Sequence, residues 1–377
     1  MIIGINAVNI NSGGGIAHIK NILDNLTQDF KNNNNNKIII WVNLKLLNIL
    51  RECKKDKLNI EIINQKTYYL GVFWKFFFLY RELKKKKCDI LYAVDGLALV
   101  KFKKTIILFQ NLLPFCNHEI IKYGLSLSTL KLVFLRFLYF ISLKNSDAVI
   151  YLSKYSKTKI ENQIGKAKKS IIISHGISKD FLLKKKKFSA SNRKEINFIY
   201  ISSIDLYKYQ WNVVKALELF VKKNINIKLH LVGPVNNKTA INLLNKACYK
   251  LNANKKKLVI FHGELKKNAI INLLKKMDAF IYASSCETFG ISLLEGIASK
   301  LPVFSSNMSG LKSIFGNNYV NYFDPTDHIS IYNCLNKNFF NKKNINNVNS
   351  RKLLENFSWK EASTSTTKFI SNIHNGN

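Results

Sequence analysis

The chain has 377 residues, of which 47% are hydrophobic, and carries a formal net charge of +36. This length predicts two domains, and the hydrophobic content excludes a largely disordered chain. Six scattered cysteines without a C-x-x-C pair argue against a disulfide framework or a zinc site and favour a reducing compartment.

The basic charge has three candidate causes. An AT-rich genome favours Lys, Asn and Ile codons, as in the stretch "KNNNNNK". A basic surface would also suit an anionic membrane or a nucleic acid. No recognised nucleic-acid-binding motif is present, so we do not expect that partner. The start "MIIGINAVNI" predicts a buried strand and not a signal peptide.

Apolar runs alternate with helical patterns along the first half of the chain, which is typical of parallel β/α units. The predicted strands are Ile2–Val8, Ile38–Val42, Ile60–Ile63, Asp89–Val94, Thr105–Phe109, Ala148–Leu152 and Ser170–Ser174. The predicted helices between them are Ile16–Phe30, Phe73–Lys86 and Thr129–Lys144.

The second half repeats this alternation after a polar, basic stretch at about 176–195, which we interpret as a linker. Its predicted strands are Ile196–Ile201, Ile227–Val232, Leu258–Phe261, Ala279–Tyr282 and Pro302–Ser305. The fold class is therefore α/β, with two doubly wound domains in tandem. Ligands bind such sheets at the carboxyl ends of the strands, so we expect a site in a cleft between the two sheets.

The stretch "SSCETFGISLLEG" places Glu287 and Glu295 on either side of a predicted helix start near Gly290. Buried carboxylates need partners, and the free amides at a helix start favour an anion. The two carboxylates can accept hydrogen bonds, and the amides between them can donate hydrogen bonds. This arrangement suits a nucleotide sugar, which has sugar hydroxyls, a diphosphate and a ribose. Alternatively, Glu287 is a helix-terminal acid and Glu295 an exposed helical residue.

This stretch resembles the E-x7-E element of the retaining glycosyltransferases of family 4 (glycosyl transferases group 1), which have the two-domain GT-B fold. The resemblance extends through residues 258–325, and "LVGP", "FSWKEAS", "IGINAVNINSGGGIAHIKNIL" and "SDAVIYLSKYSK" are similar to further landmarks of that family. It implies an acceptor-side domain at 1–175, a linker at 176–195 and a donor-binding domain at 196–355. A terminal helix at 356–377 would pack back on the first domain.

The resemblance also implies roles for individual residues of this loop. Glu287 would contact hydroxyls of the donor sugar, and Glu295 would hydrogen-bond the ribose. Backbone amides near Phe289, Gly290 and Ile291 would face the sugar and the phosphates.

Two further segments are similar to donor-binding elements of the family. In "YISSIDLYKYQWNVVKAL", Lys208 stands where the family's lysine binds the diphosphate, and such a cation stabilises a leaving phosphate. The family's arginine is replaced by Ser203, so one cation is missing. Gly14 and Gly15 in "SGGGIAH" would approach the donor diphosphate or the acceptor, or would simply form a tight turn.

Other positions depart from the family or suggest no catalytic role. Gln110 stands where the family often has a histidine, so we name no catalytic base. His18, His118 and His175 could line the cleft or be structural. We expect no cofactor and no metal, because no Asp-x-Asp motif or ligand spacing indicates one.

We therefore predict a metal-independent, retaining hexosyltransferase that moves a sugar from a nucleotide sugar to a glycan or lipid-linked acceptor. Its expected setting is cell-surface polysaccharide or lipopolysaccharide assembly in the cytoplasm, as a peripheral protein on the inner face of the plasma membrane. The aromatic and basic segments at 68–87 and 125–143 suit a membrane interface, or else core packing. The alternatives are another GT-B enzyme such as a sugar-nucleotide epimerase, or a sugar-nucleotide or membrane-binding module without turnover.

Overall fold

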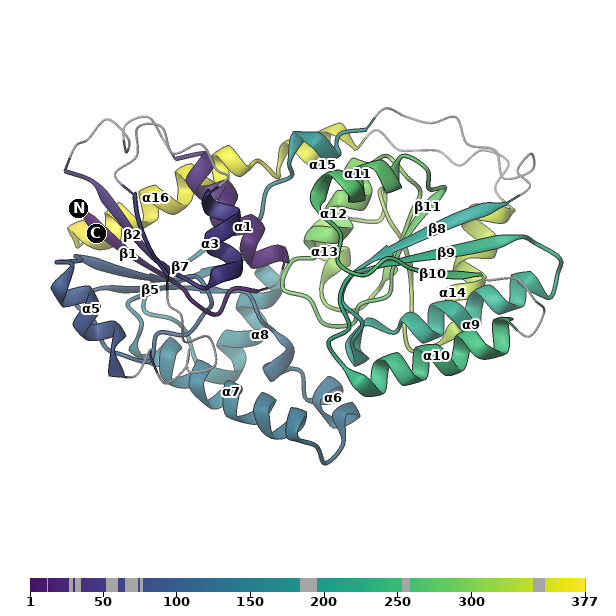
Figure 1. The fold of residues 1–377 in the computed structure, drawn as a ribbon, viewed down its shortest axis with the longest axis horizontal. Coiled ribbons are helices and arrows are strands. Elements are labelled where there is room, and N and C mark those ends of the chain that lie inside the picture. Colours follow the sequence, from purple (N-terminus) through teal and green to yellow (C-terminus); the bar gives the residue numbers. More distant parts are fainter. Residues whose placement is uncertain are drawn as a thin grey trace. The chain divides into compact units, whose positions relative to one another are not determined.

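The computed structural model describes residues 1–11, 13–26, 30, 35–51, 60–64, 74, 77–183, 195–252, 258–341 and 350–376. The chain divides into two compact units (Figure 1). Unit 1 comprises residues 1–120, 124–176 and 357–377, and unit 2 comprises residues 121–123 and 177–356.

Unit 1 is built on a seven-stranded parallel sheet with the order β3-β2-β1-β4-β5-β6-β7. Its strands are β1 Ile2–Ala7, β2 Lys37–Val42, β3 Ile60–Asn64, β4 Ile90–Ala93, β5 Thr105–Phe109, β6 Ala148–Tyr151 and β7 Ser170–Ile172. Every residue of β4, β5 and β6 is buried, as expected for strands covered by helices on both faces.

Two groups of helices cover this sheet. One face carries α1 Gly13–Asp24, α3 Leu44–Arg51 and α16 Trp359–Asn375. The other carries α5 Leu79–Lys85, α7 Leu127–Asn145 and α8 Lys154–Ile164, and the short α6 Asn117–Ile120 precedes α7 (Figure 1). Helix α16 packs on α1, and the Ser363 hydroxyl donates to the carbonyl of Ile22 at 2.9 Å.

Unit 2 repeats the design with six parallel strands in the order β10-β9-β8-β11-β12-β13. The strands are β8 Ile196–Ile201, β9 Ile227–Val232, β10 Val259–Phe261, β11 Ala279–Tyr282, β12 Val303–Ser306 and β13 Asn321–Phe323. The helices are α9 Gln210–Val221, α10 Lys238–Asn252, α11 Lys267–Leu274, α12 Ile291–Ala298, α13 Leu311–Phe315, α14 His328–Leu335 and α15 Arg351–Glu355. Figure 1 shows α11, α12 and α13 on one face of the sheet, and α9, α10 and α14 on the other.

The same device fixes neighbouring strands in both units. An aspartate immediately before an inner strand accepts an amide at the start of the strand beside it. Asp89 accepts from Ile2 at 2.7 Å, and Asp278 accepts from Asn197 at 2.8 Å. These bonds satisfy strand-end amides that would otherwise lie unpaired at the amino edge of each sheet.

The predicted α/β class with two doubly wound, Rossmann-like domains is confirmed. Several boundaries differ from the prediction. Helix α1 begins at Gly13 instead of Ile16, and the short strand β13 was not predicted. Residues 184–194 of the predicted linker, and part of the segment 68–87, lie outside the described residues. None of the described helices combines the length and hydropathy that crossing a bilayer requires.

Candidate donor-binding site

The loops that follow β8 and β11 in unit 2 bring Lys208 and Glu287 together. After β8, the chain forms a single 3₁₀ turn at Leu206–Lys208, which begins with the Asp205 carboxylate accepting the Leu206 amide at 2.8 Å. Tyr209 then adopts a left-handed conformation with φ 49°, and α9 begins. Lys208 is the last residue of this turn, and its buried ammonium contacts Tyr282, the last residue of β11.

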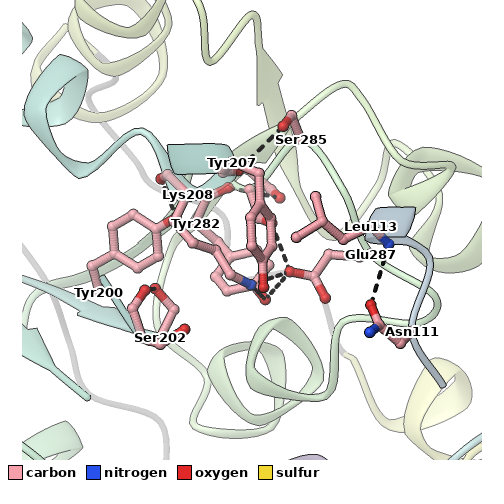
Figure 2. Close-up of polar contacts among 12 residues, drawn as sticks. Asn111, Leu113, Tyr200, Ser202, Tyr207, Lys208, Tyr282, Ser285 and Glu287 are labelled. Carbon is pink, nitrogen blue, oxygen red and sulfur yellow. Dashed lines mark hydrogen bonds and ion pairs between the residues drawn. The ribbon is translucent and has the colours of Figure 1, made fainter. Parts of the chain in front are cut away.

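The carboxylate of Glu287 accepts three hydrogen bonds on one oxygen. Oε1 accepts from the Tyr282 hydroxyl at 2.7 Å, from the Ser284 hydroxyl at 2.6 Å, and from the Lys208 ammonium, with which it forms an ion pair (Figure 2). None of the described residues donates to Oε2. A ligand hydroxyl could therefore bind the carboxylate without displacing its protein partners.

Aromatic rings surround the Lys208 ammonium. It lies 4.7 Å from the centre of the Tyr207 ring and 5.3 Å from that of Tyr282, and it donates to the Tyr282 hydroxyl at 3.3 Å. The Tyr200 hydroxyl donates to the Lys208 carbonyl at 2.6 Å. Burial, and then the charge of Glu287, raise the pKa of all three tyrosines well above the ordinary value. The three tyrosines therefore remain neutral. The ion pair of Lys208 with Glu287 supplies the positive and the negative charge of the cluster.

A second contact ties the two loops together. The amide of Ser285 donates to the Tyr207 carbonyl at 2.9 Å, and its hydroxyl donates to the same oxygen at 3.2 Å (Figure 2). These two hydrogen bonds connect the loop after β8 to the loop after β11. They therefore help to fix the distance between Lys208 and Glu287.

Helix α12 begins four residues after Glu287, and the residue just before it has an unusual backbone conformation. Gly290 has φ 87°, and a Cβ added there would lie 2.8 Å from Cδ2 of Leu311. No side chain caps this helix start, so its first amides, including that of Ile291, are available to an anion. The Phe289 ring is buried against Phe315 at 5.7 Å between ring centres, so only its backbone could face a ligand.

Glu295 lies in the second turn of α12 and is half-buried. Burial raises the pKa of its carboxyl to about 8, while the charge of Lys267 acts in the opposite direction. No residue in the described part of the chain donates a hydrogen bond to this carboxyl. An acceptor that lacks partners in the protein is suited to the hydroxyl donors of a ligand.

Ser203 is half-exposed on the loop after β8. The Gln210 side chain donates to its carbonyl at 2.8 Å and to the Ser202 hydroxyl at 3.0 Å. Gly233 supports this loop closely, since a Cβ added there would lie 2.2 Å from the Ser202 carbonyl oxygen. The loop before Lys208 thus carries the hydroxyls of Ser202 and Ser203. Ser203 stands at the position where the family that this sequence resembles has an arginine.

Gly14 and Gly15 lie in unit 1, in the first turn of α1. Neither has a positive φ, so the backbone at these positions is helical and does not form a separate tight turn. The apolar pattern from Ile16 onward did not show that the helix begins within the glycines. Their backbone amides are those of a helix start.

The three histidines fall into two settings in unit 1. His18 and His175 are buried with their ring centres 5.4 Å apart, and both contact the Trp359 ring. His118 is exposed and lies 3.4 Å from the carboxylate of buried Glu119. Within the described residues, no group of three His, Cys, Asp or Glu side chains could hold a metal ion.

The cluster contains three side chains that were not predicted from the sequence, namely Tyr207, Tyr282 and Ser284. Ser284 lies only three residues before Glu287, but no sequence pattern indicated the hydrogen bond between their side chains. No pattern indicated Tyr282 and Tyr207 either, because their contacts with Lys208 depend on how two loops meet.

Comparison with known proteins locates the chain among glycosyltransferase folds. Residues 183–348 match the sequence profile of the family described as Glycosyl transferases group 1. The matched range includes Lys208, Glu287 and Glu295. No curated protein matches the chain.

Solved structures with the same fold extend over the whole chain. Anabaena Alr3699/HepE in complex with UDP and glucose is 14% identical with a TM-score of 0.71, covering 98% of this chain and 99% of its own. A glycosyltransferase from Rickettsia africae is 19% identical with a TM-score of 0.67, covering 99% and 98%. Sucrose-phosphate synthase from Thermosynechococcus elongatus is 13% identical with a TM-score of 0.74, covering 100% of both chains.

The fold is therefore that of the GT-B glycosyltransferases, with two Rossmann-like domains. The family match in unit 2 and the fold together support a glycosyltransferase.

Proposed function

We propose that the protein is a retaining, metal-independent hexosyltransferase of family 4. It would move a sugar from a nucleotide-sugar donor to a glycan or lipid-linked acceptor in cell-surface polysaccharide or lipopolysaccharide assembly. The observation that carries this proposal is the Lys208–Glu287 pair at the carboxyl edge of a sheet, with Glu287 four residues before the first residue of a helix that no side chain caps.

Each part of a nucleotide sugar has a suitable group in unit 2. The free Oε2 of Glu287 would accept from hydroxyls of the donor sugar. Lys208 and the amides at Gly290 and Ile291 would bind the diphosphate, with the Ser203 hydroxyl replacing the absent arginine. Glu295 would accept from the ribose hydroxyls, and no further cofactor is needed.

Lys208 would also contribute to the chemical step. Negative charge develops on the leaving diphosphate in the transition state, and a fixed cation stabilises that charge most where water is excluded. The side chain of Lys208 is only 7% exposed, and its tyrosine neighbours hold it in place. In unit 1, the Gln110 amide donates to the Val94 carbonyl at 2.8 Å and is no base. The leaving phosphate itself would take the acceptor proton in a front-face transfer.

UDP-glucose is the first donor to test, because complexes of the Anabaena protein hold UDP with glucose and UDP-glucose. A donor made in the cytoplasm would place the reaction there, and a lipid-linked acceptor would bring the protein to the inner face of the membrane.

The test is a transfer assay with labelled UDP-sugars and the lipid and glycan fractions of the host cell. We expect labelled product and released UDP from the wild type, and a loss on the order of 10²-fold in Glu287→Gln. The matched control Glu195→Gln removes a surface carboxylate of unit 2 and should retain activity. NMR of the product should show the donor's anomeric configuration.

Two outcomes would contradict the proposal. A changed sugar nucleotide without any acceptor would indicate an epimerase. Nucleotide binding without turnover for any donor would indicate a binding module, for which the replacement of the arginine by Ser203 would be the cause.

A further inference from the structure

Helix α7 of unit 1 exposes a continuous apolar surface. Seven large apolar side chains in and just before this helix are between 43% and 109% exposed. They are Leu125, Leu127, Leu130, Val133, Phe134, Phe137 and Phe140, which we call the α7 apolar face. Contiguous apolar surface of this kind on a folded unit indicates an interaction site.

The α7 apolar face lies opposite the side of the helix that packs on the sheet. The buried residues Leu138, Tyr139, Ser142 and Leu143 occupy one side of the helix. At 100° per residue, the exposed apolar positions fall on the other side. A helix that is apolar on both sides normally has protein or lipid on both.

The charged residues of the helix and of the segment just before it have one sign. From residue 121 to residue 146 the sequence contains no Asp or Glu, whereas Lys131 and Lys144 are exposed on the helix. Arg136 donates to the side chains of Asn117 and Gln163 at 2.8 Å each, which anchors the helix to its neighbours. An apolar face with cations and without acids matches the surface of an anionic bilayer.

A second helix on the same face of the sheet also exposes aromatic and basic side chains, and it carries one acid, Glu82, in its first turn. Around α5, the aromatic side chains of Phe78 and Tyr80 are exposed, and Lys84 and Lys85 form its basic last turn. Figure 1 shows α5 and α7 covering the same side of the unit 1 sheet.

We propose that unit 1 docks on an anionic phospholipid bilayer through the α7 apolar face. Helix α7 would lie along the membrane surface, with its Leu and Phe side chains among the lipid chains and its lysines at the headgroups. This inference goes beyond the proposed function and does not depend on it, since the face and the donor site belong to different units.

The experiment is flotation of the full-length protein with vesicles of phosphatidylcholine alone or mixed with phosphatidylglycerol, at low and high salt. We expect binding to the anionic vesicles that weakens with salt. Phe134→Glu/Phe137→Glu should lower the partition coefficient by at least about tenfold. The matched control Leu243→Glu/Tyr249→Glu makes the same kind of change at exposed apolar positions of α10 in unit 2, and should retain binding.

The proposal fails if the wild type does not float with anionic vesicles, or if both double variants lose binding equally. The latter would show that the overall basic charge causes adsorption. It also fails if light scattering shows a wild-type dimer that Phe134→Glu/Phe137→Glu makes monomeric, because the face would then bind a second copy. Circular dichroism and a UDP-induced thermal shift, unchanged from the wild type, would show that the variant folds and that its donor site is intact.

Discussion

At the scale of single residues, the Lys208–Glu287 pair is the charged centre of the proposed donor site. Separating two charges from water costs free energy that only close contact and further hydrogen bonds recover. Tyr282 and Ser284 supply those bonds. Because the hydrogen bonds from the described residues reach only one oxygen of Glu287, the pair can be stable without a ligand and still offer a ligand an acceptor.

This view predicts strong coupling between the two residues in stability. Glu287→Gln and Lys208→Met should each lower the free energy of unfolding by about 3 kcal/mol, because each leaves the other residue as a nearly buried charge without its counter-charge. The double variant should lose at least about 1 kcal/mol less than the sum of the two. Urea denaturation measures these differences.

The control cycle is the Lys228–Glu195 pair, 2.9 Å apart and on the surface of the same unit. Its coupling should stay below about 1 kcal/mol. Equal coupling in the two cycles would mean that burial does not strengthen the Lys208–Glu287 pair.

Glu295 predicts a pH dependence of stability. Its pKa in the folded state is about 8, above the ordinary 4.5, so the folded protein retains a proton that the unfolded chain releases. The stability from this group is fully present below pH 4.5 and is lost as the pH rises to about 8. Glu295→Gln should therefore gain stability relative to the wild type as the pH increases over this range.

Thermal unfolding of the wild type and Glu295→Gln at a series of pH values between 5 and 8 provides the measurement. Glu218→Gln, a change at a surface ion pair, should keep the wild-type pH dependence. Parallel curves for the wild type and Glu295→Gln would show that this carboxyl is ionised in the folded protein throughout.

At the scale of elements, the start of α12 depends on a glycine for two reasons. Gly290 has a positive φ, and Leu311 occupies the space of a Cβ. Gly290→Ala should cost more than about 1 kcal/mol of stability and weaken nucleotide binding, because the helix start must shift.

Gly316→Ala separates these two effects. Gly316 has φ 70°, but nothing lies within 4 Å of an added Cβ. This variant should show the backbone cost alone and bind nucleotide as the wild type does. Equal nucleotide affinity in both variants, measured by calorimetry, would contradict a role for the Gly290 turn in binding.

Three segments of unit 1 meet at the histidine pair. His18 comes from α1, His175 follows β7, and Trp359 begins α16. A Cβ on Gly176 would lie 2.1 Å from the Trp359 amide nitrogen, so this junction is tightly packed. The Tyr92 hydroxyl and His18 Nε2 share a hydrogen bond of 3.0 Å.

This junction predicts sensitivity to acid. Burial lowers the pKa of His175 from 6.5 to about 3, and burial together with His175 lowers the pKa of His18 well below its ordinary value. Both are neutral when folded, so their contribution is complete above pH 6.5 and is lost as the pH falls toward 3.

His18→Gln/His175→Gln should therefore flatten the fall of the melting temperature between pH 6.5 and pH 4, whatever its absolute stability. His328→Gln, at the start of α14 in unit 2, is the control and should leave the slope unchanged. An unchanged slope in the double variant would mean that other groups cause acid unfolding.

At the scale of the whole molecule, the sequence allowed the fold to be predicted where burial is continuous. The strands Thr105–Phe109 and Ala279–Tyr282 have the predicted bounds, because fully buried parallel strands are unbroken apolar runs. The start of α1 at Gly13 could not be predicted, because glycine weakens the helical pattern.

The candidate site was predictable only in part. The sequence indicated Glu287, Glu295 and Lys208 one by one, but Lys208 and Glu287 stand far apart in the chain, and only the fold shows that they pair. The ring contacts of Tyr207 and Tyr282 depend on two loops whose conformations are set by each other. Such contacts leave no periodic signal in a sequence.

The measurement that tests the central claim most directly is a thermal-shift screen of the protein against UDP, GDP, ADP and their sugar conjugates. A nucleotide at a hundredfold its dissociation constant should stabilise the protein by about 2.7 kcal/mol. We expect a shift with one base, greatest for UDP and its sugars, that is lost in Glu295→Ala. The absence of a shift with any nucleotide, or an equal shift in Glu295→Ala, would contradict the donor site in unit 2.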